Sequence, residues 1–221
     1  MSRARGTPRR LHVLVTAGPT REYVDPVRFL SNESSGRMGF AVAAAARAAG
    51  HRVTLVAGPV HLETPAGVER IDVVSARDML AACSRVFAKA DAVIMTAAVA
   101  DYRPAKRLKG KWRAKDGPGD TARIDLVENP DVLATLGRAK ARGRGTKGPR
   151  TVIGFALETG SGHARALAKL HAKHADWIVL NDASALNAER SSATILGRDG
   201  SVKSLAKRSK RDIARELVGL L

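Results

Sequence analysis

Cysteine, aromatic residues and long apolar runs are scarce in this sequence, and each scarcity excludes a class of protein. The single cysteine, Cys83, cannot form an intramolecular disulfide, and no cysteine–histidine cluster has the spacing of a zinc site. No apolar run approaches the ~20 residues of a membrane-spanning helix. Aromatic residues make up 4% of the chain, which is too few to stack the bases of a nucleic-acid single strand. We expect a reduced, cytoplasmic setting in which Cys83 is a small buried residue.

Two marks of a nicotinamide-dependent dehydrogenase are also missing. Thr-Ala-Gly-Pro-Thr, at 16–20, stands where the G-x-G-x-x-G fingerprint would follow the first expected strand. Gly58-Pro59 follows the second expected strand, where an acidic residue would hold the ribose. Both absences weigh against an ordinary NAD enzyme. A Rossmann-type NAD(P)- or flavin-binding oxidoreductase stays an alternative because of the order of the elements.

Positive charge is abundant, with a net charge of +17, but it is not spread along one helix. More than half of the lysines and arginines lie in four segments that contain no acid: 1–10, 103–115, 138–150 and 203–211. These segments read as loops and tails, so we favour a solvated basic surface over a nucleic-acid-binding domain, which remains a second alternative. The segment 138–150 matches no motif that we can name.

Strand-like and helical patterns alternate along the 221 residues, which suits one α/β domain. The alternation predicts a single doubly wound, mostly parallel Rossmann-like sheet with helices on both faces, and a hairpin about Gly200. We expect residues 1–10 to be a basic disordered tail and 11–221 to be a nucleotide-binding domain. The expected strands are 11–16, 52–57, 69–74, 92–97, 123–127, 151–156 and 177–180. The expected helices are 39–49, one that Ser75 caps and that runs to about residue 90, one that begins near Pro130 with the proline in its first turn, 164–174 and 207–220.

The segment 25–39 carries the strongest functional signal. It places Ser34, Ser35 and Gly36 directly before an alanine-rich helix, and such a helix start offers free N–H groups to an anion. The simpler interpretation is an ordinary serine cap. The loop 16–21 is expected to reach the same edge of the sheet, and this favours a nucleotide site.

Three further loops carry polar residues at the ends of expected strands. Asp101 follows the strand 92–97 and could hold Mg²⁺ bound to a nucleotide, although it could also cap a helix or pair with Arg103. The lysine-rich stretch that follows, about 103–120, predicts a basic lid loop that closes over phosphates. Phe155 lies at the end of another strand, and Asn181 ends the next, where a plain turn is the simpler interpretation. Lys169 and Lys173 share one helical face, which by default is a solvated face.

These segments together resemble the phosphopantothenate–cysteine ligase (phosphopantothenoylcysteine synthetase) family of coenzyme A biosynthesis. The matching motifs lie at 15–22, 25–32, 34–39, 97–104, 129–131, 154–159 and at Asn181. The resemblance runs from about Leu11 to the C-terminus and implies a free-standing ligase without the flavin decarboxylase domain. It implies a homodimer that uses 4'-phosphopantothenate, L-cysteine and, more readily than ATP, CTP. The carboxylate would form an acyl-cytidylate with release of pyrophosphate, and cysteine would then displace CMP.

The resemblance also implies roles for individual residues. Asn32 would bind the acyl-nucleotide intermediate, Lys111 would be the lid lysine, and Arg28 would steady the loop or an anionic group of the substrate. Asp101 would hold the metal or a nucleotide hydroxyl. The nucleotide and its phosphates would contact Gly18, Ser34, Ser35, Gly36, Ala98, Asp101, Phe155, Lys169, Lys173 and Asn181. Two departures from the family pattern are Arg37, where a lysine is usual, and Trp112 in the lid.

Overall fold

In the computed structural model, residues 9–113, 122–143, 151–158, 162–182 and 190–221 are described. Parts of three predicted segments lie outside them, namely 1–8 of the basic tail, 114–120 of the lid and 144–150 of the third basic segment. Thr159 of the motif 154–159 lies outside them as well. None of the described helices combines the length and the apolar character that crossing a membrane requires.

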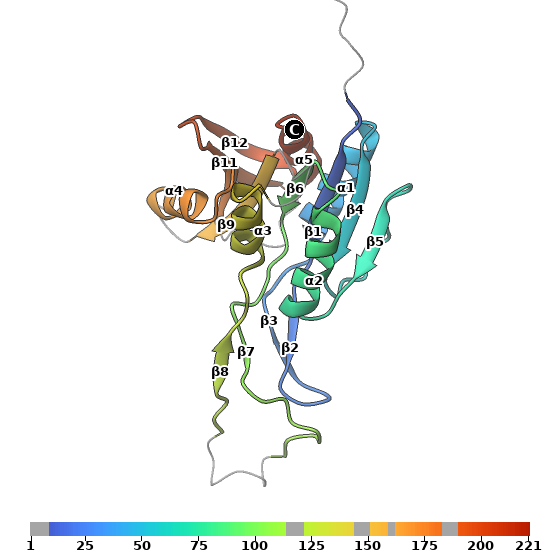
Figure 1. Cartoon of the computed structure of the whole chain (residues 1–221), viewed down its shortest axis with the longest axis vertical. Helices are drawn as coiled ribbons and strands as arrows, with labels where there is room; N and C mark the ends of the chain where they lie inside the picture. Colours follow the sequence, from blue (N-terminus) through green and yellow to red (C-terminus); the bar gives the residue numbers. More distant parts are fainter. Residues whose placement is uncertain (1–8, 114–121, 144–150, 159–161, 183–189) are drawn as a thin grey trace, which may run out of the picture.

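A large, mostly parallel sheet forms the body of the molecule, with the strand order β12-β11-β10-β9-β6-β1-β4-β5 (Figure 1). Its parallel strands are β1 (His12–Ala17), β4 (Arg52–Ala57), β5 (Glu69–Asp72), β6 (Ala92–Met95), β9 (Thr151–Glu158) and β10 (Trp177–Asp182). The strands β11 (Arg190–Gly197) and β12 (Val202–Ser209) form an antiparallel hairpin at one edge, as predicted about Gly200. From β1 the chain adds strands first on one side and then on the other, so the predicted doubly wound α/β fold is confirmed and its switch point lies between β1 and β6.

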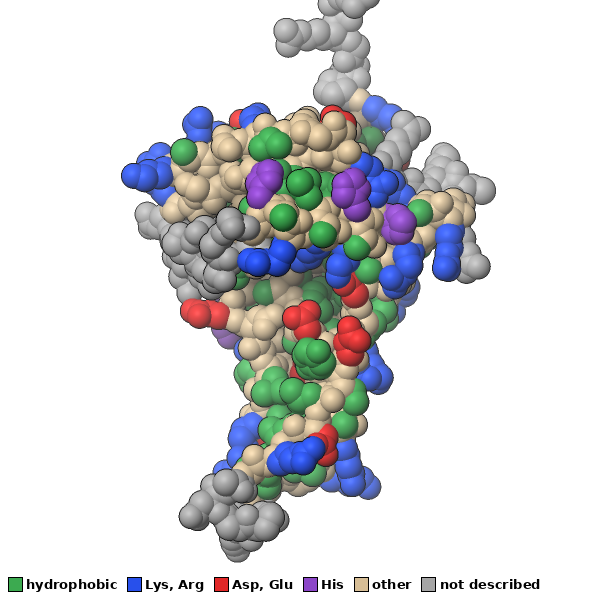
Figure 2. Space-filling model, turned by 90° about the vertical axis from the view of Figure 1, so that its left-hand side faces the viewer, with side chains coloured by type: hydrophobic (Ala, Val, Ile, Leu, Met, Phe, Trp, Pro, Cys, Tyr) green, Lys and Arg blue, Asp and Glu red, His purple; other side chains and the backbone are tan. Residues whose placement is uncertain are grey.

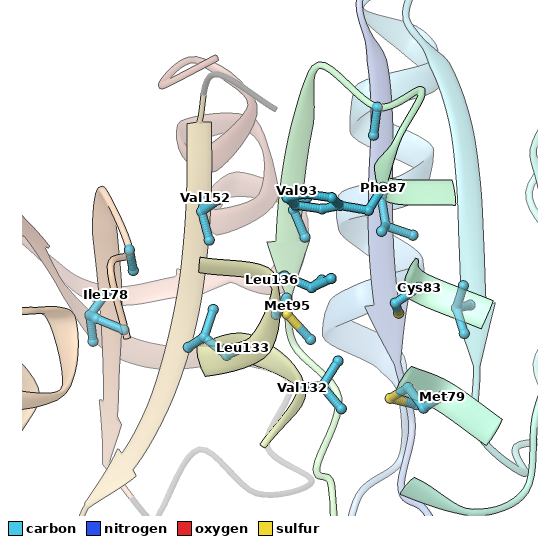
Figure 3. Packing of buried hydrophobic residues seen from close by; sticks show 14 of the residues in the cluster. Met79, Cys83, Phe87, Val93, Met95, Val132, Leu133, Leu136, Val152 and Ile178 are labelled. Carbon is cyan, nitrogen blue, oxygen red and sulfur yellow. The ribbon is translucent and has the colours of Figure 1, made fainter. Parts of the chain in front are cut away.

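Helices cover both faces of the sheet, as predicted. The helices α1 (Arg37–Ala48) and α5 (Lys210–Val218) pack on one face, and α2 (Ala76–Phe87), α3 (Val132–Ala141) and α4 (His163–Ala172) pack on the other. In Figure 3, Met79 and Cys83 of α2 and Leu136 of α3 gather beside Val93 and Met95 of β6. Cys83 is fully buried, as predicted, and burial raises the pKa of its thiol to about 12, so it is an inert core residue.

Capping side chains set where two of the helices begin. Ser75 caps α2 as predicted, through a reciprocal capping box with Asp78. The prediction that a helix has Pro130 in its first turn is wrong. Asp131 caps that helix by accepting the N–H of Ala134 at 2.7 Å, so Pro130 lies before the helix.

Two other helix starts also differ from their predicted positions. The helix α1 begins at Arg37, before the predicted residue 39, because Gly36 takes the cap position with a φ of 74°. The helix α5 begins after the predicted residue 207, because β12 continues to Ser209. The Ser209 hydroxyl then caps α5 by accepting the N–H of Asp212 at 3.2 Å.

A slender arm extends from the carboxyl edge of the sheet (Figure 1). We define the arm as residues 21–31, 102–113 and 122–128. It contains two small antiparallel sheets, β2 (Arg21–Tyr23) with β3 (Phe29–Ser31), and β7 (Tyr102–Pro104) with β8 (Leu126–Glu128). The sequence missed β2, β3 and β7, since strands of three residues are too short to show a period of two. It placed β8 too early, at 123–127, and it read the last two residues of β7, Arg103 and Pro104, as part of a lid loop.

Candidate active site

A cleft of 520 Å³ opens at the carboxyl edge of the sheet, beside the switch point between β1 and β6. Doubly wound sheets bind their ligands at this place. Most of the predicted site residues line the cleft: Asn32, Ser34, Ser35, Gly36, Ala98, Asp101, Phe155, Lys169 and Asn181. The tertiary structure thus brings together residues that lie up to 149 positions apart in the chain.

The loops that follow β1 and β6 are tied to each other at the floor of the cleft. Two buried threonines of the first loop accept backbone N–H groups of the second, Thr16 from Ala97 at 3.2 Å and Thr20 from Ala100 at 2.9 Å. The N–H of Ala98 donates to the carbonyl oxygen of Gly18 at 2.9 Å. The loop 16–21 also meets the start of α1, as predicted, since a Cβ atom built on Gly36 would lie 3.5 Å from Cα of Gly18.

The start of α1 is an open anion-binding position rather than a serine-capped helix end. The cap residue is Gly36, no side chain caps the helix, and the first turn contains no acidic residue. The hydroxyl of Ser34 lies 3.4 Å from the N–H of Gly36, which is a long contact outside the helix. The N–H groups of the first turn and the positive end of the helix dipole are thus available to a phosphate.

Glycine is required where α1 meets β1. A Cβ atom on Gly39 would lie 2.4 Å from Cβ of Ala17 and 2.8 Å from the carbonyl oxygen of Thr16. Both distances are far below van der Waals contact, so only glycine lets the first turn of the helix lie this close to the strand. This contact sets the position of the helix start relative to the floor of the cleft.

Asn32 is fixed against the floor of the cleft. Its Nδ2 atom donates to the carbonyl oxygen of Val99 at 3.0 Å and approaches that of Ala98 at 3.5 Å. An amide NH₂ group has two hydrogens, so one can point to a ligand while the other holds the side chain in place. The exposed position of Asn32 on the cleft wall suits a residue that contacts a substrate.

Asp101 is an exposed carboxylate that lines both the cleft and a smaller pocket, whereas Lys210 at the start of α5 lines the cleft but not that pocket. Arg103 donates to the carbonyl oxygen of Glu128 and to Oδ1 of Asn129. The guanidinium of Arg103 is thus bound by these two residues, and not by Asp101 as the alternative interpretation of Asp101 required. Over the described part of the chain, no three carboxylate, histidine or cysteine side chains converge on one point. One carboxylate beside an anion-binding helix start nevertheless fits Mg²⁺, which keeps most of its waters and takes phosphate oxygens.

A smaller pocket of 170 Å³ adjoins the cleft and shares Asp101 and Phe155 with it. Both predicted lysines of α4 reach this pocket: Lys169 donates to the carbonyl oxygen of Phe155 at 3.0 Å, and Lys173 forms an ion pair with Asp131. The default interpretation of a solvated lysine face is therefore wrong. Asp131, the residue that caps α3, also lines this pocket; it belongs to the matching motif 129–131, but the sequence assigned it no role.

Ser191, Lys210 and Arg37 line the cleft at its other end, together with Asn181. None of these three was predicted as a site residue. Ser191 lies near the start of an antiparallel strand, Lys210 lies in a basic segment that we interpreted as solvated, and Arg37 was noted only as a departure from the family pattern. Burial lowers the pKa of Lys210, and the nearby positive charge of Arg37 lowers it further.

Arg28 and Lys111 lie in the arm, and neither is among the described residues that line the cleft. Arg28 pairs with Asp25, whose side chain is fully buried, and Lys111 precedes Trp112, whose backbone also contacts Asp25. Asp25 accepts the Nε–H of Arg28 and the backbone N–H of Trp112, each at 3.0 Å. Burial alone would raise the pKa of Asp25, but hydrogen bonds from backbone N–H groups and the charge of Arg28 outweigh it and lower the pKa to about 2.

A family model described as the DNA/pantothenate metabolism flavoprotein C-terminal domain matches residues 9–221. The chain is 43% identical over 211 residues to the coenzyme A biosynthesis bifunctional protein CoaBC of Haemophilus influenzae, covering 94% of this chain and 50% of that protein. It is 42% identical over 212 residues to the protein of the same name in Bacillus subtilis, with the same coverage of 94% and 50%. The chain therefore spans about half the length of the curated relatives that it matches.

Solved structures agree with this match. The crystal structure of the C-terminal domain of CoaBC has a TM-score of 0.79 and 38% identity, and the alignment covers 97% of this chain and 95% of that one. A Cab2 mutant in complex with phosphopantothenate-cysteine has a TM-score of 0.73 over 95% of this chain and 85% of that one. Its 14% identity to this chain shows a common fold and no more.

Proposed function

Because the chain belongs to the DNA/pantothenate metabolism flavoprotein C-terminal domain family, we propose that it is the ligase that joins 4'-phosphopantothenate to L-cysteine. One observation carries the proposal: Asn32 stands beside the open start of α1 in a cleft at the switch point of the sheet. A helix start of this kind suits the phosphates of a nucleotide. The cleft thus offers both a phosphate site and an amide donor that a ligase of this chemistry needs.

The proposed reaction has two steps. In the first, an oxygen of the substrate carboxylate attacks the α-phosphorus of CTP, the bond to the β-phosphate breaks, and pyrophosphate leaves. In the second, the amine of cysteine attacks the acyl carbon of the acyl-cytidylate, loses a proton and expels CMP. The Nδ2–H of Asn32 donates to the acyl-nucleotide oxygen on which negative charge develops.

The nucleotide would lie with its phosphates along Ser34, Ser35 and Gly36 and its base towards the smaller pocket. Phe155, Lys169 and Lys173 supply the wall of that pocket. We propose CTP rather than ATP from the family resemblance. Asp101 would hold Mg²⁺, which when bound would neutralise charge on the phosphates.

We also propose that two copies associate through the arm. The arm exposes several large apolar side chains: Phe29, Tyr102, Ile124, Leu126 and Val127. Figure 2 shows hydrophobic side chains gathered along the narrow part of the molecule below its body. Two-stranded sheets of this size are marginal by themselves, and burial against a second copy would stabilise them. In such a dimer Arg28 and Lys111 of one copy would reach the cleft of the other, since they do not line their own.

The experiment is to measure pyrophosphate release with 4'-phosphopantothenate and CTP or ATP, with and without cysteine. We expect turnover that needs all three substrates, with CTP faster than ATP. Substitution of Asn32 by alanine is expected to lower turnover about 100-fold while nucleotide binding is kept, because the lost donor acts on charge that develops only during the reaction. A folded wild-type protein that releases no pyrophosphate with either nucleotide would refute the proposal, and normal turnover in Asn32→Ala would refute the role of Asn32.

A further inference from the structure

The end of the cleft away from Asp101 is lined by four polar side chains that come from four different elements. Arg37 is the first residue of α1, Lys210 is the first residue of α5, and Asn181 and Ser191 lie on the neighbouring strands β10 and β11. The helices α1 and α5 pack against each other on the same face of the sheet, and both start at the edge that forms the cleft. Two helix starts and two cations therefore meet at one end of one cleft.

Ser191 and Asn181 each bury a polar atom that has no protein partner within the described residues. The Ser191 side chain belongs to a residue that is 6% exposed, and its hydroxyl makes no hydrogen bond. The Oδ1 atom of Asn181 is in the same situation. Buried polar atoms in native proteins are nearly always satisfied, so a group without a protein partner at the wall of a cleft indicates that a ligand satisfies it.

The chemistry of these groups selects an anion. A serine hydroxyl can donate, rotation of an amide presents its Nδ2 donor in place of Oδ1, and lysine and arginine only donate. Burial and the charge of Arg37 both work against the charged form of Lys210, and a bound anion would offset both effects. Two cations that are themselves the first residues of two helices match a group with two negative charges, such as a terminal phosphate, better than a carboxylate with one.

We propose that Lys210, Ser191 and Arg37 form a subsite for a terminal phosphate group of a substrate, at the end of the cleft opposite Asp101. The inference rests on the proposed ligase function, and none of these three residues is part of the site that the sequence predicted. Lys210 supplies the charge, and Ser191 supplies a hydrogen bond that fixes the orientation. Two substrates carry a terminal phosphate, the nucleoside triphosphate and 4'-phosphopantothenate, and the test separates them.

The experiment compares ligands that differ only in the terminal phosphate. Calorimetry would measure binding of CTP against CDP, and of 4'-phosphopantothenate against pantothenate, to the wild type and to Lys210→Gln. We expect the substitution to weaken binding of the member of one pair that carries the additional phosphate about tenfold and to leave its partner unchanged, since a charge-assisted hydrogen bond is lost. A loss for CTP alone places the nucleotide tail in the subsite, and a loss for 4'-phosphopantothenate alone places the phosphate monoester there.

Two further variants keep the test specific. Arg211→Gln is the matched control, because Arg211 is the exposed neighbour of Lys210 on the same helix and does not line the cleft. Ser191→Ala should weaken the same ligand several-fold without lowering the melting temperature of the free protein, since its hydroxyl makes no bond within the described protein. A purely structural serine would instead lower the melting temperature.

Unchanged binding of all four ligands in Lys210→Gln would overturn the inference, as would equal losses for both members of a pair. These outcomes differ from failure of the ligase function. If the wild type itself bound neither CTP nor 4'-phosphopantothenate, the proposed function would fall, and the subsite with it. If the wild type bound both and turned them over, only the subsite would be at stake.

Discussion

The cleft and the arm of this molecule are built on opposite principles. The cleft is supported by a buried parallel sheet, by loops tied together through buried threonines, and by the contact of Gly39 with β1. The arm has no such core: Tyr102 is 54% exposed and Leu126 is 46% exposed, whereas Val93 at the centre of the sheet is fully buried. The difference teaches that the positions in the cleft are set within one chain, while the arm presents surface that this chain leaves uncovered.

Charged side chains hold the arm in place, whereas the cleft rests on a packed sheet and on hydrogen bonds of uncharged threonines. The buried carboxylate of Glu22 accepts the N–H of Ala76 at the start of α2, at 2.8 Å. Asp25 holds the loop between β2 and β3, and the guanidinium of Arg107 lies over the ring of Tyr23 at 4.8 Å. We therefore expect the stability of the arm to change with pH and with substitution of single charged residues. The stability of the packed region should change with the volume of its side chains.

The largest expected effect breaks the packing under the cleft. Gly39→Ala should lower the free energy of unfolding by about 3 kcal/mol, because the new Cβ overlaps backbone and side-chain atoms that cannot move aside. Gly110→Ala is the control in the arm, where a Cβ meets nothing within 4 Å. Denaturant unfolding of both variants measures the difference. Equal stabilities would show that α1 is not fixed against β1 as described.

The next prediction tests whether the exposed face of the arm is an interface. Leu126→Asp should raise the dissociation constant of the proposed dimer about 100-fold, because it would bury an unpaired charge between the copies. Val202→Asp is the control, since Val202 is 56% exposed on β12 and lies outside the arm. Sedimentation at several concentrations reads out the association. A wild type that stays monomeric at all of them would contradict the proposal.

A third prediction sharpens the division of labour between cleft and arm. Asn32→Ala and Arg28→Ala are each expected to be nearly inactive, one in the cleft and one in the arm. Mixing the two variants under exchange should restore up to roughly a quarter of wild-type turnover, because half of the dimers then contain one site with both residues intact. A mixture no more active than its components would show that Arg28 does not serve the cleft of the partner.

The smallest effect concerns acid. Because the pKa of Asp25 is lowered from 3.8 to about 2, its stabilisation of the arm is full above pH 4 and is lost as the pH falls towards 2. Hydrogen exchange, corrected for intrinsic rates, should show the N–H of Arg28 losing protection over that range while the N–H of Ala100, held by Thr20, keeps it.

Two variants isolate this acid effect. Asp25→Asn should remove the pH dependence at Arg28, since no carboxylate then titrates at that position. Asp125→Asn, at an exposed carboxylate of the arm, should leave it intact. If the backbone N–H groups of Arg28 and Ala100 lost their protection against exchange over the same pH range in the wild type, the arm and the cleft would open as one unit.

The sequence alone determined the body of this protein. Short apolar runs such as 92–97 alternate with alanine-rich helical patterns, so the doubly wound sheet, the hairpin about Gly200 and the burial of Cys83 could all be predicted. Polar loops that follow parallel strands must share one edge, and this is why the position of Asn32, Ser34 and Asp101 in one cleft was predictable. The family could also be predicted from the sequence, because its motifs are short stretches of residues that occur in a fixed order along the chain.

Features that depend on contacts between distant parts of the chain, namely the arm and the membership of the cleft, could be seen only in the tertiary structure. The arm depends on strands of three residues, which are too short to show a period, and β7 pairs with β8 across more than twenty positions. Arg28 lies outside the cleft because it pairs with Asp25 in the arm. Asp25 also accepts the backbone N–H of Trp112, 87 positions further along the chain, and this keeps the neighbouring Lys111 in the arm as well. Ser191 and Lys210 joined the cleft because an antiparallel hairpin and a terminal helix return to the edge where α1 begins. Contacts of this kind depend on the three-dimensional path of the chain, which a single sequence does not display.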